Sequence, residues 1–175
     1  METQKLAPGK FAINYGVILG LVMVVISVIA YVTGLALEGA QWPTAIYYII
    51  FPVVIFYAIS QYKKRNASLL TLSEALKVGV LIGVISAIVF VIYSLIFNYI
   101  IDPDFVNQMK DVARDNMLEQ NPDMTQEMVD QGMKFVEMFT NPAIMGAFWI
   151  ALSALFGLIY ALIGGLIMKK ETKLS

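Results

Sequence analysis

The most constraining feature of this sequence is a long stretch without charge that follows a helix-start signal. Thr71 and Glu74 have the spacing of a capping box, in which each side chain bonds the other residue's backbone amide in the first turn of a helix. From Val78 to Ile101 the chain carries no charged residue. At about 1.5 Å per residue such a helix is roughly 36 Å long, enough to cross a hydrocarbon core about 30 Å thick. The stretch therefore predicts a transmembrane helix, which we place at residues 76–101.

The composition also favours a membrane protein. Apolar residues make up 59% of the chain and charged residues 14%, whereas soluble domains have about 45–50% and about 25%. Cysteine and histidine are both absent, which excludes disulfides, thiolate nucleophiles, Cys/His zinc sites and imidazole acid–base catalysis. We expect one integral membrane domain that covers residues 1–175.

Three further uncharged runs predict the remaining spans, at about 11–37, 44–62 and 142–168. The first run is longer than the core of a signal peptide, which has about 7–15 residues, so we expect it to remain in the protein as a span. Pro52 lies in the middle of the second run. Because proline removes one backbone hydrogen bond and clashes with the preceding turn, we expect this helix to bend there.

Basic residues are distributed unevenly between the two ends of these spans. Nine fall at one end: Lys5, Lys10, Lys63, Lys64, Arg65, Lys77, Lys169, Lys170 and Lys173. Three fall at the other end: Lys110, Arg114 and Lys134. The positive-inside rule then places both termini and the loop between the second and third spans in the cytoplasm. The expected fold is an all-α membrane protein with four transmembrane helices, N-in/C-in, and an extracytoplasmic helical hairpin between helices 3 and 4.

The extracytoplasmic segment, residues 102–141, is the one long polar insert. It holds nine acidic and three basic residues, a net charge of −6. Apolar residues recur at helical spacing on both sides of Asn121 and Pro122, which predicts two amphipathic helices joined as a hairpin. Its candidate partner-contact residues are Phe105, Met109, Met128, Phe135 and Phe139.

Six of the ten methionines lie in this insert and allow two interpretations. Thioether ligands suit Cu(I), but because no His or Cys assists them we interpret these residues as packing or adaptable contact residues. Asp102, Asp104 and Asp123 lack the glycine and the ligand spacing of a calcium-binding EF-hand loop. Helix N-caps explain these aspartates more simply. We therefore expect no metal and no cofactor.

Small residues recur every four positions in three of the spans. Such rows let helix backbones approach closely, and packing drives helix association in lipid. The helix-packing candidates are Gly16, Gly20, Gly79, Gly83, Ala87, Ser153, Gly157, Ala161 and Gly165. We expect them to seat the four helices of one chain against each other, with a role in homodimerisation as the alternative.

No ionisable side chain lies well inside any predicted span, although such groups mark proton relays and ion paths. The spans also lack paired aspartates, a Ser/His pair and a metal site, so we do not expect an enzyme. Asn98 and Tyr99 lie one turn before Asp102, and with Asp104 they would line an outer mouth of the bundle.

The order of these parts resembles a known family. The segment Leu70–Gly79, the aliphatic span after it, the segment Ile101–Phe105 and the acidic, methionine-bearing insert before a last span resemble the bacterial membrane family known as domain of unknown function 4199. The resemblance covers roughly residues 8–170 and implies a four-span protein of the bacterial inner (cytoplasmic) membrane. It implies no activity, substrate or catalytic residues.

Two classes of function fit these observations. The first is a non-enzymatic interaction or accessory protein whose acidic outer hairpin contacts a membrane protein, a periplasmic protein or another copy of the chain. The alternative is a transport or channel component for a small neutral or lipid-like solute, with the bent second span as its moving part. A continuous polar path would favour transport, whereas a packed bundle with an exposed apolar stripe on the hairpin would favour interaction. The lipid bilayer is an expected partner and nucleic acid is not.

Overall fold

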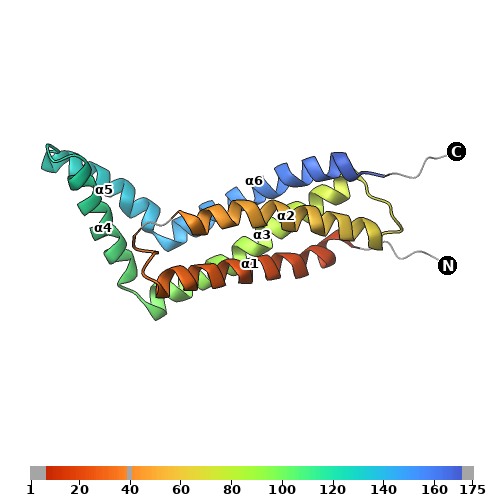
Figure 1. Ribbon diagram of the computed structural model, residues 1–175, viewed down its shortest axis with the longest axis horizontal. Coiled ribbons are helices and arrows are strands. Elements are labelled where there is room, and N and C mark those ends of the chain that lie inside the picture. Colours follow the sequence, from red (N-terminus) through yellow and green to blue (C-terminus); the bar gives the residue numbers. More distant parts are fainter. Residues whose placement is uncertain (1–6, 39–40, 171–175) are drawn as a thin grey trace.

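The computed structural model describes residues 7–38 and 41–170, and in these the chain is predominantly helical (Figure 1). Four long helices run alongside one another as a bundle, and two shorter helices form a hairpin at the end opposite the termini. Each long helix is apolar and long enough to cross a membrane. No β-strand occurs in the described part of the chain. The predicted all-α fold, with four candidate spans and a helical hairpin between the last two, is therefore confirmed.

The first helix, α1 (Pro8–Val32), ends before its uncharged run does. Gly34 has a backbone φ of +78°, the left-handed conformation that commonly ends a helix. Thr33 reinforces this end by donating its hydroxyl to the carbonyl of Ile29 at 2.7 Å. The last residues of the span expected at 11–37 consequently form turns instead of helix.

The second helix, α2 (Trp42–Arg65), is longer than the run expected at 44–62. Three basic residues occupy its last turn, where positive charge interacts favourably with the helix dipole. Lys63 also donates its ammonium group to the carbonyl of Met168 at 2.8 Å, which ties the end of α2 to the end of the last helix. Pro52 lies inside α2, which continues on both sides of it. The bend expected at this proline stays a prediction.

The third helix, α3 (Leu72–Ile96), begins at the predicted capping box. The Glu74 amide donates to the Thr71 hydroxyl at 3.2 Å, and the Thr71 amide donates to the Glu74 carboxylate at 2.8 Å. The two bonds satisfy amides that the first turn of a helix otherwise leaves without partners. The helix start predicted from the sequence is confirmed.

The end of the third span is a π-helix, η1 (Phe97–Ile101), which the sequence analysis did not predict. The Asp102 amide closes this wide turn by donating to the Phe97 carbonyl at 2.9 Å. Within it, the Asn98 side-chain amide nitrogen donates back to the Ser94 carbonyl at 2.7 Å. Single π-turns inside α-helices are frequent at functional sites. The π-turn therefore indicates where a functional site is to be expected.

The last helix, α6 (Pro142–Met168), coincides with the span expected at 142–168. The side chain of Asn141 caps its start by accepting from the amides of Ala143 and Ile144 at 3.0 and 3.2 Å. At the other end, the backbones of Leu70 and Lys170 exchange two hydrogen bonds of 2.9 Å. This bridge holds the end of α6 against the loop that precedes α3.

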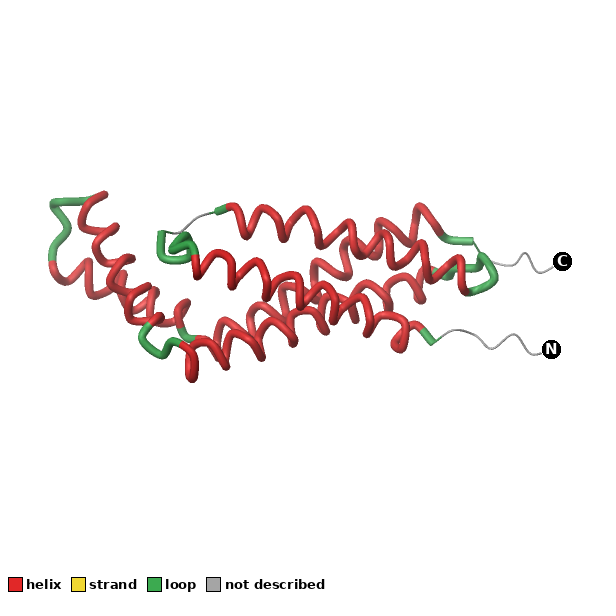
Figure 2. Tube along the Cα trace, turned by 60° about the horizontal axis from the view of Figure 1, so that its bottom comes forward, coloured by secondary structure: helices red, strands yellow, loops and turns green. Residues whose placement is uncertain are grey.

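Figure 2 shows the long helices lying side by side, with the hairpin at the end away from the two termini. The bundle is organised around α3, which contacts each of the other three long helices and packs most extensively on α1 and α6. The half of the bundle near the termini is filled by side chains that are 0% exposed, including Ile55, Tyr62 and Val78. Large apolar residues cover the outside of the bundle, for example Ile18, Val25, Ile92 and Ile167. An apolar exterior of this kind matches hydrocarbon as solvent.

The hairpin consists of α4 (Phe105–Gln120) and α5 (Gln126–Thr140). Thr125 caps α5, because its hydroxyl accepts from the Met128 amide at 3.4 Å. Val129 is 1% exposed and is the one buried residue of the two helices. The hairpin therefore depends on a very small apolar core.

Candidate functional site

The described residues form a cavity of about 420 Å³ in the half of the bundle next to the hairpin. All four long helices, the π-turn and both hairpin helices contribute to its wall. Its volume is within the range of about 300–1,000 Å³ that is usual for small-molecule sites. No charged side chain is among the described residues that line it.

Aromatic rings make up much of the wall. They come from α1, α2, α3, the π-turn, the hairpin and α6, and comprise Tyr31, Tyr47, Phe90, Tyr93, Phe97, Phe105, Phe139 and Trp149. The Tyr47 and Trp149 rings pack with centroids 5.0 Å apart. The hydroxyl of Tyr47 also shares a hydrogen bond of 3.1 Å with Ser153, which is 1% exposed. These contacts fix the side of the cavity formed by α2 and α6.

Polar groups in the wall are few and uncharged. They include Ser27 on α1, Ser94 on α3 and Asn98 in the π-turn. The Ser94 carbonyl can only accept, so the Asn98 side chain must turn its nitrogen toward it, as the 2.7 Å bond shows. The Asn98 carbonyl oxygen has no hydrogen-bond partner among the described residues. This oxygen is also accessible, because the described residues contain no fully buried polar side-chain atom that lacks a hydrogen-bond partner.

The start of the hairpin is attached to α1 beside the cavity. Tyr31 donates its hydroxyl to the Asp102 carboxylate at 2.9 Å. Its ring packs edge-on against Phe97 and Phe105, at centroid distances of 4.8 and 5.6 Å. The same three rings therefore connect the start of the hairpin to the cavity wall.

The outer mouth expected from four residues forms only in part. Asn98 lines the cavity, whereas Tyr99 is 61% exposed and lies outside the lining. Asp102 bonds Tyr31, and Asp104 accepts from the side chain of Asn107 at 3.1 Å. Consecutive residues of a helix point to different faces, so Asn98 and Tyr99 do not both face the cavity.

The interpretation of the hairpin aspartates as N-caps holds for the position of Asp104 but not for Asp123. Asp104 occupies the N-cap position of α4 without a side-chain capping bond. Thr125 caps α5, so Asp123 has no such role. Among the described residues, no group of three or more Asp, Glu, His or Cys side chains is arranged to hold a metal ion.

The five candidate partner-contact residues occupy two places. Phe105, Met109 and Phe139 lie in the cavity wall. Met128 and Phe135 lie on the exposed side of α5, at 52% and 66% exposure. The sequence pattern places all five residues on apolar faces of helices. Only the angle between the hairpin and the bundle decides which of them lie in the cavity wall and which lie on the exposed side of α5.

The small-residue rows lie between helices of the same chain. All nine candidates are buried: Gly16, Gly20, Gly79, Gly83, Ala87, Ser153, Gly157, Ala161 and Gly165. A Cβ added at Gly157 would lie 2.6 Å from the carbonyl oxygen of Gly79, so α3 and α6 touch through their backbones. A Cβ at Gly20 would lie 2.6 Å from Cβ of Val89 on α3. These rows bring α1 and α6 close to α3.

Several cavity residues were missed by sequence reasoning. Tyr47, Tyr93 and Trp149 read as ordinary membrane aromatics, because rings near the ends of spans are common. The only local signal was the spacing of Ser94 and Asn98, two polar residues four apart on one face of an apolar helix.

Comparisons with known proteins give one match. A family model described as "Protein of unknown function (DUF4199)" matches residues 14–170, nearly the whole chain. Neither the search of curated proteins nor the search of solved structures found a match.

Proposed function

The chain belongs to the DUF4199 family of proteins of unknown function, and from its structure we propose a non-enzymatic interaction protein of the bacterial inner (cytoplasmic) membrane. Its acidic hairpin lies outside the membrane and binds another protein. The observation that carries this proposal is an exposed apolar stripe on α5.

The stripe comprises Met128, Phe135 and Met138, which are 52%, 66% and 43% exposed. Phe135 lies seven residues after Met128, and Met138 lies three residues after Phe135, which places them on one face of the helix. A neighbouring face packs against α4; it includes the buried Val129 and Gly132, where an added Cβ would lie 3.1 Å from the Met117 sulfur. Apolar residues aligned on an exposed helix face are typical of a helix that docks into a groove of a partner.

The charge of the hairpin favours a protein over the membrane surface as the occupant of this stripe. The insert carries a net charge of −6, so anionic lipid headgroups would repel it. A partner with an apolar groove rimmed by Lys or Arg complements both properties. We therefore assign the stripe to a basic-rimmed protein partner.

Two further features support this function over the alternatives. The described residues of the cavity wall include no charged side chain for acid–base chemistry, which favours a non-enzymatic role. The half of the bundle near the termini is closed by fully buried side chains such as Ile59 and Tyr62. Solute transport through the bundle has less support for that reason.

Photo-crosslinking in native membranes tests the hairpin. Probes at Met128 and Phe135 are expected to trap one discrete protein, identified by mass spectrometry. A probe at Glu137, which is exposed on the opposite face of α5, is the matched control and should not trap it. Self-crosslinks alone, or adducts with lipid alone, would contradict a heterologous protein partner.

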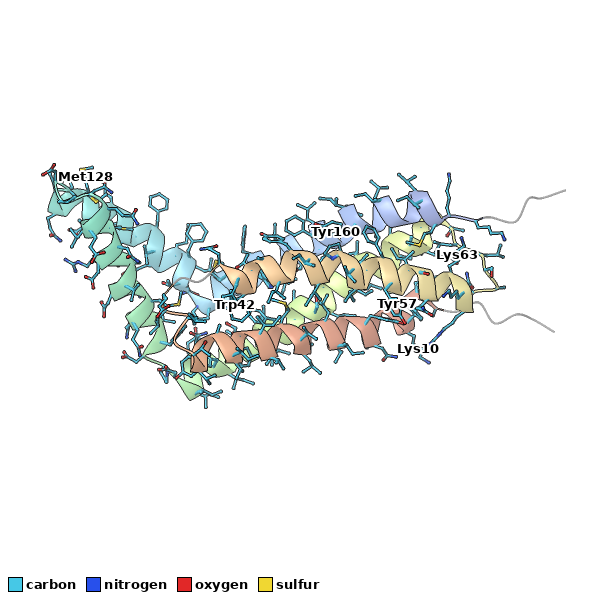
Figure 3. All side chains as sticks on the ribbon, in the orientation of Figure 1. Lys10, Trp42, Tyr57, Lys63, Met128 and Tyr160 are labelled. Carbon is cyan, nitrogen blue, oxygen red and sulfur yellow. The ribbon has the colours of Figure 1, made fainter. Side chains whose placement is uncertain are left out.

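The proposed orientation rests on the distribution of charge. The described basic residues at the bundle end near the termini are Lys10, Lys63, Lys64, Arg65, Lys77, Lys169 and Lys170. Figure 3 shows Lys10 and Lys63 at this end and Met128 at the tip of the hairpin. Lys5 and Lys173 lie outside the described residues. The positive-inside rule places this end in the cytoplasm.

Cysteine labelling in spheroplasts checks the orientation on a clean background, because the chain has no native cysteine. Asn116→Cys on α4 is expected to react with a membrane-impermeant maleimide. Ser73→Cys, which is exposed at the start of α3, should react only after the membrane is permeabilised. The reverse pattern would overturn the N-in/C-in orientation.

A further inference from the structure

We propose that the cavity beneath the hairpin binds an uncharged membrane-soluble alcohol or phenol, with its apolar body among the rings and its hydroxyl on Asn98. This site does not rest on the hairpin's protein partner. It follows from the size of the cavity, the chemistry of its wall and the hydrogen-bonding state of one side chain.

The wall excludes charged ligands. None of the described lining residues is charged, and the cavity lies within a bundle whose outside is apolar. Burying an unpaired charge in such surroundings costs several kcal/mol or more. The aromatic and aliphatic majority of the wall instead matches an apolar body. Ligands of this kind reach the protein by partitioning into the bilayer.

Asn98 decides which polar group the ligand carries. Its amide nitrogen is engaged by the Ser94 carbonyl and by the Ser94 hydroxyl, at 2.7 and 3.3 Å. Its carbonyl oxygen therefore remains as an acceptor at the cavity wall. An acceptor pairs with a ligand group that donates, so we assign the ligand's hydroxyl to this oxygen, which an ether of the same shape would leave unpaired.

Residues of the hairpin form the wall of the cavity at this end of the bundle. Phe105 and Met109 at the start of α4, and Phe139 at the end of α5, belong to the wall. Because Phe105 packs on Tyr31 and Phe97, a ligand that fills the cavity also contacts the residues that hold the hairpin. Occupancy of the site is thereby linked to the position of the hairpin.

Tryptophan fluorescence gives a direct test. The chain has two tryptophans, and Trp149 lines the cavity, so the Trp42→Phe protein reports on the site alone. In lipid nanodiscs, 8-bromooctan-1-ol is expected to quench Trp149 saturably, because bromine quenches on contact. Its methyl ether should require at least about tenfold higher concentration, equivalent to about 1.4 kcal/mol for the lost hydrogen bond.

Variants distinguish binding of the probes in the cavity from their general partitioning into lipid. In the same background, Asn98→Leu is expected to abolish the preference for the alcohol over the ether. Ser27→Leu should weaken both probes at least about tenfold by filling the cavity from α1, where Ser27 makes no hydrogen bond to another described residue. Tyr99→Phe, next to Asn98 but outside the lining, should bind like the parent. Thermal unfolding of each variant confirms that the fold is intact.

Three results would overturn the proposal. Quenching that rises without saturation and is equal for alcohol and ether would show partitioning into lipid only. Saturable quenching by a dibrominated phosphatidylcholine, lost in Ser27→Leu, would assign the cavity to a phospholipid tail instead. Retention of the alcohol preference in Asn98→Leu would remove Asn98 from the site.

Discussion

Replacing Gly83 with leucine is expected to cost about 3 kcal/mol or more of folding stability, the upper end of what overpacking costs. Gly83 lies on α3 where the backbone of α6 crosses it. A Cβ at this position would overlap the carbonyl oxygen of Ser153, which is backbone and cannot rotate away. Phe51 closes the remaining space, since its nearest ring atom would be 3.4 Å away. The two helices would have to separate along the whole contact.

The measurement is the midpoint of unfolding in mixed detergent micelles, together with the size of the protein on gel filtration. Gly9→Leu is the matched control, because a Cβ at Gly9 would come no closer than 3.8 Å to Leu81. We expect the control to stay within about 0.5 kcal/mol of the parent. Equal stability of the two variants would show that α3 and α6 do not meet at this row.

Replacing Val129 with aspartate is expected to unfold the hairpin while the four-helix bundle stays folded. Val129 is 1% exposed and is the one buried residue of α4 and α5. An uncompensated buried charge costs about 3–5 kcal/mol, and two short helices with so small a core have little stability to offset it. The bundle has its own core, so the loss should remain local.

Hydrogen–deuterium exchange and limited proteolysis of residues 105–140 measure this effect. Met128→Asp is the control, because it introduces the same charge at the neighbouring position, which is 52% exposed. Fast exchange confined to the hairpin is expected only in the Val129 variant. Loss of the photo-crosslinked partner should accompany it. Equal protection of the hairpin in both variants would contradict a core centred on Val129.

The sequence by itself determined the features that depend on near neighbours. Four spans follow from charge-free runs, because a membrane helix must be apolar over its own length. The capping bonds between Thr71 and Glu74 join residues three apart, so their spacing was sufficient. Helical periodicity on both sides of Pro122 predicted two helices. The end of α1 was misplaced because hydropathy does not register the turn at Gly34.

Only the tertiary structure decided which helices meet and where a cavity remains. The bond between Tyr31 and Asp102 joins residues 71 apart, and that between Tyr47 and Ser153 joins residues 106 apart. Small residues indicated that backbones approach, but the pairing of Gly79 with Gly157 depends on the crossing of two whole helices. The cavity beside Asn98 is equally non-local, because its wall combines rings from several helices. Aromatic residues look alike in an apolar sequence, and only packing separates those that face lipid from those that surround a cavity.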